Sequence, residues 1–216
     1  GGRAPRLVAV SKTKPVELLR EAYAAGQRVF GENYVQEITE KAPQMPEDVQ
    51  WHYIGHLQSN KANALVKGVP SLACVESVDS AKIATKLSNA CENAGRADKL
   101  GVMVQVNTSG EESKAGVEPG EAAVELAKHI VSEACPNLEL LGLMTIGMPD
   151  YTSKPENFEC LARCRAEVAA ALALDEDALD LSMGMSGDFE AAVRMGSTNV
   201  RVGSTIFGAR SYPNKA

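Results

Sequence analysis

The chain has 216 residues, of which 44% are hydrophobic, so it is long enough to build one sizeable core or two small ones. Its formal net charge is −6 at pH 7, and the sequence lacks the basic patch or stripe that nucleic-acid-binding proteins carry. No stretch approaches the roughly 20 apolar residues that a membrane-spanning helix needs. We therefore expect neither a nucleic acid nor a membrane among its partners.

The N-terminal residues show no signal peptide, and Gly1 and Gly2 lead almost directly into an apolar run. This start is typical of a trimmed chain. The sequence therefore leaves open a short N-terminal extension, and with it a signal that targets the protein to an organelle. The five cysteines form no small-domain disulfide framework, and their odd number argues against full pairing. We expect free thiols in a reducing compartment, and hence a cytoplasmic protein.

Short apolar runs alternate with helical stretches along the whole chain. Strands are predicted at residues 7–12, 28–31, 51–56, 71–76, 101–107, 138–145, 178–183 and 199–203. These runs are mostly continuous, as in parallel strands that are covered on both faces. Helices are predicted from Pro15, as the first helical residue, to a stop at Gly26, at residues 81–95, capped by Asp79 or Ser80, and at 119–134 and 155–173.

The alternation of eight strands with helices predicts a single (β/α)8 TIM-type barrel near its minimum size, with residues 1–216 as one domain. An open doubly wound sheet is the alternative. The first strand, however, runs into SKTKPVE, which contains no glycine-rich dinucleotide fingerprint. In such a barrel the functional groups lie at the C-terminal ends of the strands, so those positions are the candidates for a site.

The first strand, LVAVSK, has the composition of a core strand and yet ends on Lys12. Val8 and Val10 share a strand face with Lys12, although the sequence does not tell which face points inward. An inward lysine would be desolvated and could form a Schiff base, whereas an outward one is a solvated loop residue. Lys14 precedes Pro15, so we expect it to be extended and exposed.

The loops after the seventh and eighth strands combine glycine with hydroxyl residues. The segment SMGMSGDFEAAVRMG reads as a strand, a glycine-rich turn and a helix, with Ser186 as the expected N-cap of that helix, and the second loop carries Gly203 and Ser204. Barrels frequently bind phosphate with these two loops, although ordinary turns use the same residue types. Asp188 would repel a phosphate if it pointed inward.

Arg201 lies in the middle of the eighth strand, NVRVG, with a valine on either side. If those valines pack against helices, Arg201 points into the barrel and needs a partner there. That partner is either a buried carboxylate or a ligand atom that accepts hydrogen bonds. Together, Lys12, the two phosphate loops and Arg201 suit pyridoxal 5′-phosphate (PLP), with its aldehyde on the lysine and its ring nitrogen at the arginine.

Two pairs of residues could suggest a metal ion, but neither pair supports one. Cys160 and Cys164 are four residues apart in a predicted helix, with no second cysteine or histidine pair nearby. His52 and His56 fall on a predicted strand, which separates them by about 13 Å, too far for one ion. We expect no metal.

Five segments of the chain resemble the signature blocks of the pyridoxal-phosphate homeostasis protein family, also called the proline synthetase co-transcribed homologue family. The blocks are AVSKTKP, GENYVQE, WHYIGHLQSNK, GLMTIG and LSMGMSGDFEAAVRMGSTNVRVGSTIFG, in this order along nearly the whole chain. The resemblance implies a barrel similar to the N-terminal domain of alanine racemases (fold type III).

The resemblance also implies roles for single residues. Lys12 would carry PLP as a Schiff base, Arg201 would face the ring nitrogen, and Asn33 would lie against the cofactor. The phosphate would be held by Ser186, Gly203 and Ser204. Many relatives have Gly-Thr where this chain has Gly203-Ser204, and serine keeps the hydroxyl group. Lys114 matches a second family lysine near the mouth of the pocket, and its role stays open.

Members of the family are thought to carry and buffer the cofactor in vitamin B6 homeostasis, with apo forms of PLP-dependent enzymes as recipients. An arginine at the ring nitrogen keeps that nitrogen unprotonated, which weakens the ring as an electron sink. Racemisation also needs a second base, which the racemases take from a C-terminal domain; this chain ends just past the eighth strand, with Tyr212 in its tail. We therefore expect no catalytic residue and no turnover.

Two other functions stay open at this point: a PLP-dependent amino-acid racemase or related enzyme, and a barrel for another phosphate ligand. The sequence also leaves the oligomeric state open between a monomer and a weak homodimer.

Overall fold

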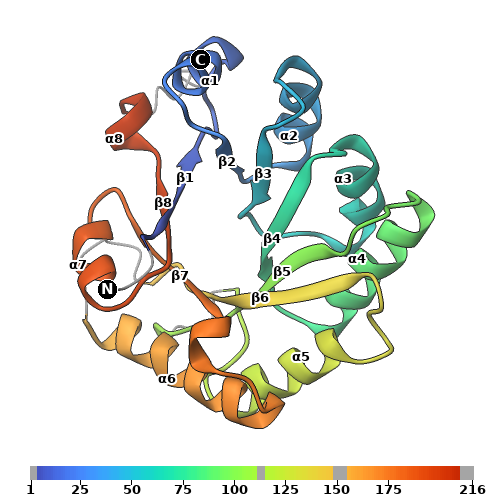
Figure 1. Cartoon of the computed structure of the whole chain (residues 1–216), viewed down its shortest axis with the longest axis vertical. Helices are drawn as coiled ribbons and strands as arrows, with labels where there is room; N and C mark the ends of the chain where they lie inside the picture. Colours follow the sequence, from blue (N-terminus) through green and yellow to red (C-terminus); the bar gives the residue numbers. More distant parts are fainter. Residues whose placement is uncertain (1–3, 111–114, 148–154, 210–216) are drawn as a thin grey trace, which may run out of the picture.

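The computed structural model of the chain describes residues 4–110, 115–147 and 155–209. Within these residues, eight parallel strands close into a barrel in their order along the chain, and helices surround it (Figure 1). The strands are Arg6–Val10 (β1), Val29–Glu32 (β2), Gln50–Tyr53 (β3), Leu72–Val78 (β4), Leu100–Gln105 (β5), Leu138–Met144 (β6), Asp180–Met185 (β7) and Asn199–Val202 (β8). The predicted barrel and its eight strands are confirmed.

One α-helix follows each strand along the chain. They are Val16–Ala24 (α1), Val35–Lys41 (α2), Ala62–Gly68 (α3), Ala81–Asn93 (α4), Glu121–Val131 (α5), Pro155–Leu172 (α6), Phe189–Arg194 (α7) and Ser204–Phe207 (α8). Single 3-10 turns occupy Ala42–Gln44, Ser59–Lys61 and Glu176–Ala178. The sequence did not indicate α2, α3 and α8, because helices of seven residues or fewer span too few turns for a clear apolar period; α7 is as short, but its glycine-rich turn marked it.

Several element ends differ from the prediction by a few residues. Strand β1 ends at Val10, so Lys12 lies in the loop that follows, where the Lys14 amide donates to the Ser11 carbonyl. Pro15 is the residue before α1 rather than its first residue. Ser80 does cap α4, because its hydroxyl accepts a hydrogen bond from the Ile83 amide at 3.3 Å. Helix α7 is preceded by Asp188, not Ser186, which corrects the predicted N-cap.

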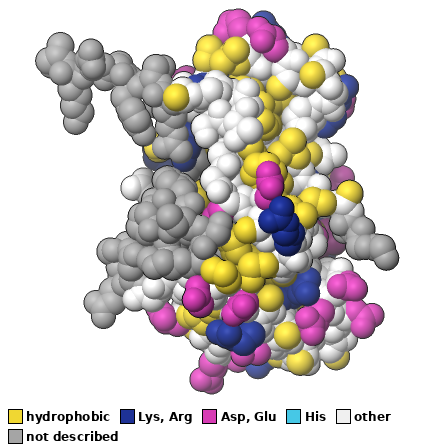
Figure 2. All heavy atoms as spheres, turned by 90° about the vertical axis from the view of Figure 1, so that its left-hand side faces the viewer, with side chains coloured by type: hydrophobic (Ala, Val, Ile, Leu, Met, Phe, Trp, Pro, Cys, Tyr) yellow, Lys and Arg dark blue, Asp and Glu magenta, His cyan; other side chains and the backbone are white. Residues whose placement is uncertain are grey.

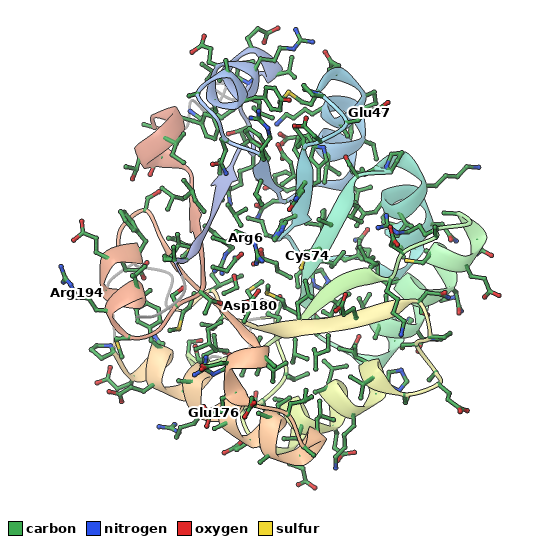
Figure 3. All side chains as sticks on the ribbon, in the orientation of Figure 1. Arg6, Glu47, Cys74, Glu176, Asp180 and Arg194 are labelled. Atoms are coloured by element: carbon green, nitrogen blue, oxygen red, sulfur yellow. The ribbon has the colours of Figure 1, made fainter. Side chains whose placement is uncertain are left out.

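The barrel has one core between its strands and helices and a second region inside the strands. The outer core includes the rings of Phe30 and Trp51, whose centroids lie 5.9 Å apart. Inside the barrel, Cys74, Met103 and Met144 form a separate apolar cluster. Figure 3 shows Arg6, Cys74 and Asp180 near the centre of the ring of strands. The interior therefore combines apolar and charged side chains.

On the face shown in Figure 2, the described lysine and arginine side chains are scattered among acidic ones rather than gathered into one basic patch. Within the described ranges, no helix combines the length and apolar character required to cross a bilayer. The five cysteines are free and buried, namely Cys74, Cys91, Cys135, Cys160 and Cys164. The described residues also contain no group of His, Cys, Asp and Glu that could hold a metal ion.

Candidate functional site

A cavity of about 540 Å³ lies at the C-terminal ends of the strands. Its walls come from β1, β7 and β8 and from the segments that follow β1, β2, β3, β6, β7 and β8. The structure brings all six residues of the predicted site together in its lining: Lys12, Asn33, Ser186, Arg201, Gly203 and Ser204. Lys114 lies outside the described residues.

Lys12 reaches the cavity from the loop between β1 and α1. Val10 also lines the cavity, whereas Ala9 belongs to the outer core between the strands and the helices. Lys12 lies in the loop rather than on the strand face of Val10, but both residues line the cavity, so the Lys12 side chain points inward, the orientation that the sequence left open. The Lys12 side chain is partly buried there.

The loops after β7 and β8 are joined by a hydrogen bond, in which the Gly203 amide donates to the Ser186 hydroxyl at 3.1 Å. A side chain at Gly203 would meet the Val10 carbonyl oxygen at 3.1 Å, so the backbone here lies close against β1. Helix α8 starts at Ser204, and the first amides of a helix lack partners within the helix. Ser204 thus offers a backbone amide and a hydroxyl group to an anion, next to Gly203, whose amide is engaged by Ser186.

The chain reaches this loop through an irregular end of β7. Gly184 has φ +96°, which favours glycine, and a Cβ there would lie 2.6 Å from the Cβ of Ala192 in α7. The glycine lets α7 pack tightly against the strand and turns the chain toward Ser186. Asp188 accepts a hydrogen bond from the Met185 amide at 2.6 Å, so that one carboxylate oxygen is held by its own turn.

Arg201 points into the barrel, as predicted, and is only 3% exposed. Its Nη1 donates to the Ser182 hydroxyl at 2.5 Å, and its Nη2 donates to the Thr145 carbonyl at 2.7 Å. The same guanidinium lies 3.9 Å from Glu76 Oε2. Burial lowers the pKa of Arg201, and the nearby Glu76 opposes that shift. A buried carboxylate therefore lies near Arg201, as one alternative expected, and since Arg201 also lines the cavity, a ligand atom as a further partner stays a prediction.

Glu76 is the centre of the polar network under the cavity. Its Oε1 accepts hydrogen bonds from His52 Nδ1 at 2.6 Å and from Asn199 Nδ2 at 3.2 Å. Its Oε2 accepts a hydrogen bond from the Ser182 hydroxyl at 2.5 Å. Burial alone would raise the pKa of Glu76, but His52, Arg201 and Ser182 outweigh it and hold the pKa below its ordinary value. The network therefore keeps a charged carboxylate under Arg201.

This network predicts how stability depends on acid. The ordinary glutamate pKa is 4.5, and that of Glu76 is lower in the folded protein. As the pH falls below 4.5, the unfolded state binds more protons than the folded state, so the free energy of unfolding decreases. Urea unfolding between about pH 3 and about pH 6 measures the slope of the free energy of unfolding against pH. Glu76→Gln should flatten it, while Glu139→Gln, at an exposed position of β6, should leave it unchanged. A wild-type slope in Glu76→Gln would contradict this account.

Asn33 presents a polar atom that still needs a partner. Its Oδ1 is buried and accepts no hydrogen bond within the described part of the chain. The Asn33 backbone is fixed by Gly55, where a Cβ would overlap the Asn33 carbonyl at 2.0 Å. A buried acceptor in the wall of a cavity is costly unless a ligand or water donates to it. The site therefore fits a ligand with polar groups on this side.

Some residues of the cavity were not predicted from the sequence. Lys14 was expected to be exposed, but it is partly buried and lines the cavity, and its Nζ donates to the Ala209 carbonyl at 2.7 Å. That contact joins loops at opposite ends of the chain, so the local sequence carries no sign of it. Glu76, which does not line the cavity but belongs to the polar network under it, was also missed, although it stands at the end of the predicted strand 71–76, where functional groups are expected.

The chain is similar to proteins of known family. The profile of the family "Alanine racemase, N-terminal domain" matches residues 2–211. The human pyridoxal phosphate homeostasis protein is 50% identical over 219 residues, which cover 98% of this chain and 78% of that protein. The structure of PipY from Synechococcus elongatus with PLP bound has a TM-score of 0.78 and 36% identity, covering 96% of this chain and 94% of PipY.

More distant structures share the fold. Alanine racemase from Corynebacterium glutamicum has a TM-score of 0.69 at 15% identity, and the match covers 98% of this chain and 58% of the racemase. This likeness identifies the barrel as the type found in the N-terminal domain of alanine racemases.

Proposed function

Since the chain belongs to the pyridoxal phosphate homeostasis protein family, we propose that it binds PLP in the cavity at the C-terminal ends of its strands. There it carries and buffers the cofactor for vitamin B6 homeostasis, without catalytic turnover. One observation carries the proposal: the lysine, the two phosphate loops, the asparagine and the arginine, selected from the sequence, line the same cavity. The PLP-bound structure of the relative PipY supports it.

We assign each residue the role that the family resemblance implies, and its place in the cavity lining supports that role. PLP supplies an aldehyde that condenses reversibly with a primary amine, and Lys12 Nζ is the amine that holds it as a Schiff base. Ser186, Gly203 and Ser204 bind the phosphate group with hydroxyl and amide donors. Arg201 donates to the ring nitrogen, and the orphan Asn33 Oδ1 accepts from a polar group of the ligand.

The same residues argue against turnover. Arginine stays protonated, so Arg201 donates to the ring nitrogen without transferring a proton to it. Racemisation needs one base on each side of the reacting carbon, and the titratable side chains among the described cavity-lining residues are Lys12, Lys14 and Arg201. Lys14 is engaged at the Ala209 carbonyl. These groups suit binding and release better than proton abstraction.

A carrier needs recipients, and we propose that these are apo forms of PLP-dependent enzymes in the cytoplasm. The five buried, unpaired thiols suit a reducing compartment of that kind.

Three measurements on one preparation test the proposal. Titration with PLP should produce a saturable visible absorption band, and incubation with a panel of L-amino acids should produce no D-amino acid. Loaded protein should then activate an apo PLP-dependent enzyme. A protein that develops no band would overturn cofactor binding, whereas D-amino acid formation in proportion to protein would replace the carrier by a racemase.

A further inference from the structure

The backbone next to Lys12 is strained. Thr13 has φ +63°, in the left-handed region, where a β-branched residue is a clear outlier. Such a conformation persists only where the surrounding structure holds it. Because Thr13 directly follows Lys12, whatever holds Thr13 also fixes the direction in which Lys12 leaves the loop.

A buried lysine on α2 supplies part of that support. Lys41 is 8% exposed, and its Nζ donates to Glu32 Oε1 at 2.6 Å and to Glu37 Oε2 at 2.7 Å. The same Nζ donates to the Ser11 carbonyl at 2.9 Å. Ser11 in turn donates from its hydroxyl to Glu32 Oε1 at 2.7 Å. The residue before Lys12 is therefore held through both its backbone and its side chain.

The residue after Lys12 is held by the same group. The Thr13 amide donates to Glu37 Oε2 at 2.9 Å, which is the oxygen that also accepts from Lys41. Glu37 and Lys41 lie one turn apart on α2. One ion pair on one helix thus contacts the chain on both sides of Lys12. We call Glu32, Glu37 and Lys41 the loop clamp.

The loop clamp differs from an ordinary surface ion pair, because two of its residues, Glu32 and Lys41, are buried. Glu32 is fully buried, and burial raises its pKa against the opposing effects of Lys41 and Ser11. A buried carboxylate and a nearly buried ammonium are costly to retain unless they are paired. In contrast, the neighbouring pair Gln36 and Glu40 on the same helix is exposed, and its side chains bond to each other at 3.0 Å.

We propose that the loop clamp is a positioning device, which holds the strained Thr13 backbone so that Lys12, rather than Lys14, is the amine presented to the cofactor. The inference rests on the proposed function, since it concerns which of two cavity lysines reacts. Both lysines line the same cavity, two residues apart, so a small change in the loop can exchange them. None of the clamp residues lines the cavity itself, and each therefore acts through the loop.

The test measures where PLP becomes attached. Protein is incubated with PLP and reduced with borohydride, and the label on Lys12 and Lys14 is quantified by mass spectrometry of peptides cut with a protease that does not use lysine. In Lys41→Met we expect the ratio of Lys14 label to Lys12 label to rise by about tenfold or more, as released backbone strain redistributes the loop. Thr13→Asn in that background should restore much of the wild-type ratio, because asparagine tolerates positive φ.

Controls separate this effect from loss of folding. Lys128→Met removes an exposed lysine paired with Glu125 and should leave the ratio unchanged. If Lys41→Met does not fold, Glu37→Leu against Gln36→Leu makes the same comparison on α2, with a changed ratio expected only in the first. An unchanged ratio in every folded clamp variant would overturn the proposal. A wild-type protein without label on any lysine would overturn the proposed function instead.

Discussion

Replacing Lys12 by alanine should remove the visible absorption band of the PLP-loaded protein and weaken PLP binding by about a hundredfold or more. The variant retains the phosphate loops and Arg201, so only the covalent part of binding is lost. Two to three kcal/mol corresponds to a factor of about 30 to about 150 in affinity, and a covalent bond within a shaped cavity contributes at least this much. Equilibrium titration followed by absorbance and by dialysis measures the change.

Lys14→Ala is the matched control for this prediction, because both lysines line the cavity from the same loop. It removes a contact to Ala209 but should retain the band at full intensity. If Lys12→Ala kept the band and Lys14→Ala lost it, the assignment of the reactive amine would be wrong. If both kept it, the cofactor would be attached elsewhere.

Replacing Glu76 by leucine should lower the free energy of unfolding by about 3–5 kcal/mol, the cost of leaving a buried charge without its partner. Glu76 is fully buried and accepts hydrogen bonds from His52, Ser182 and Asn199, and it lies near Arg201. Leucine would leave those donors unsatisfied inside the barrel. Urea unfolding at neutral pH gives the difference directly.

The same substitution on another strand supplies the control. Glu139 on β6 is exposed, so Glu139→Leu should change stability by no more than about 0.5 kcal/mol. Glu76→Gln keeps an acceptor and should cost less than Glu76→Leu. Equal losses in Glu76→Leu and Glu139→Leu would show that the network adds nothing to stability. Weaker PLP binding by Glu76→Gln would further indicate that Glu76 positions Arg201.

The barrel could be predicted because each of its strands is indicated by a short local stretch of the sequence. A strand buried on both faces needs a continuous apolar run, and each run between turn residues marked one strand. The ends were less accurate because they depend on tertiary contacts. The Ser11 amide still donates to Gly31, for example, although β1 ends at Val10. Likewise, Asp188 rather than Ser186 precedes α7, since Ser186 instead accepts from Gly203 across two loops.

The candidate site could be predicted in part because a barrel brings all strand ends to one face. Lys12 and Asn33 followed from that rule and Arg201 from the alternation of side chains along β8, and the family blocks added to all three. The supporting residues could not be found in this way, because their partners are far away in the sequence. Glu76 and Ser182 are 106 residues apart, and Lys41 and Ser11 are 30 apart. Nothing in the local sequence of α2 indicates that Lys41 is buried.

The most direct test of the account is the position of the borohydride-reduced adduct. PLP-loaded wild-type protein is reduced, and the intact mass and the peptide masses are measured. We expect one PLP group for each chain, attached to Lys12. An adduct on a different lysine, or no adduct in protein that has bound PLP, would contradict it.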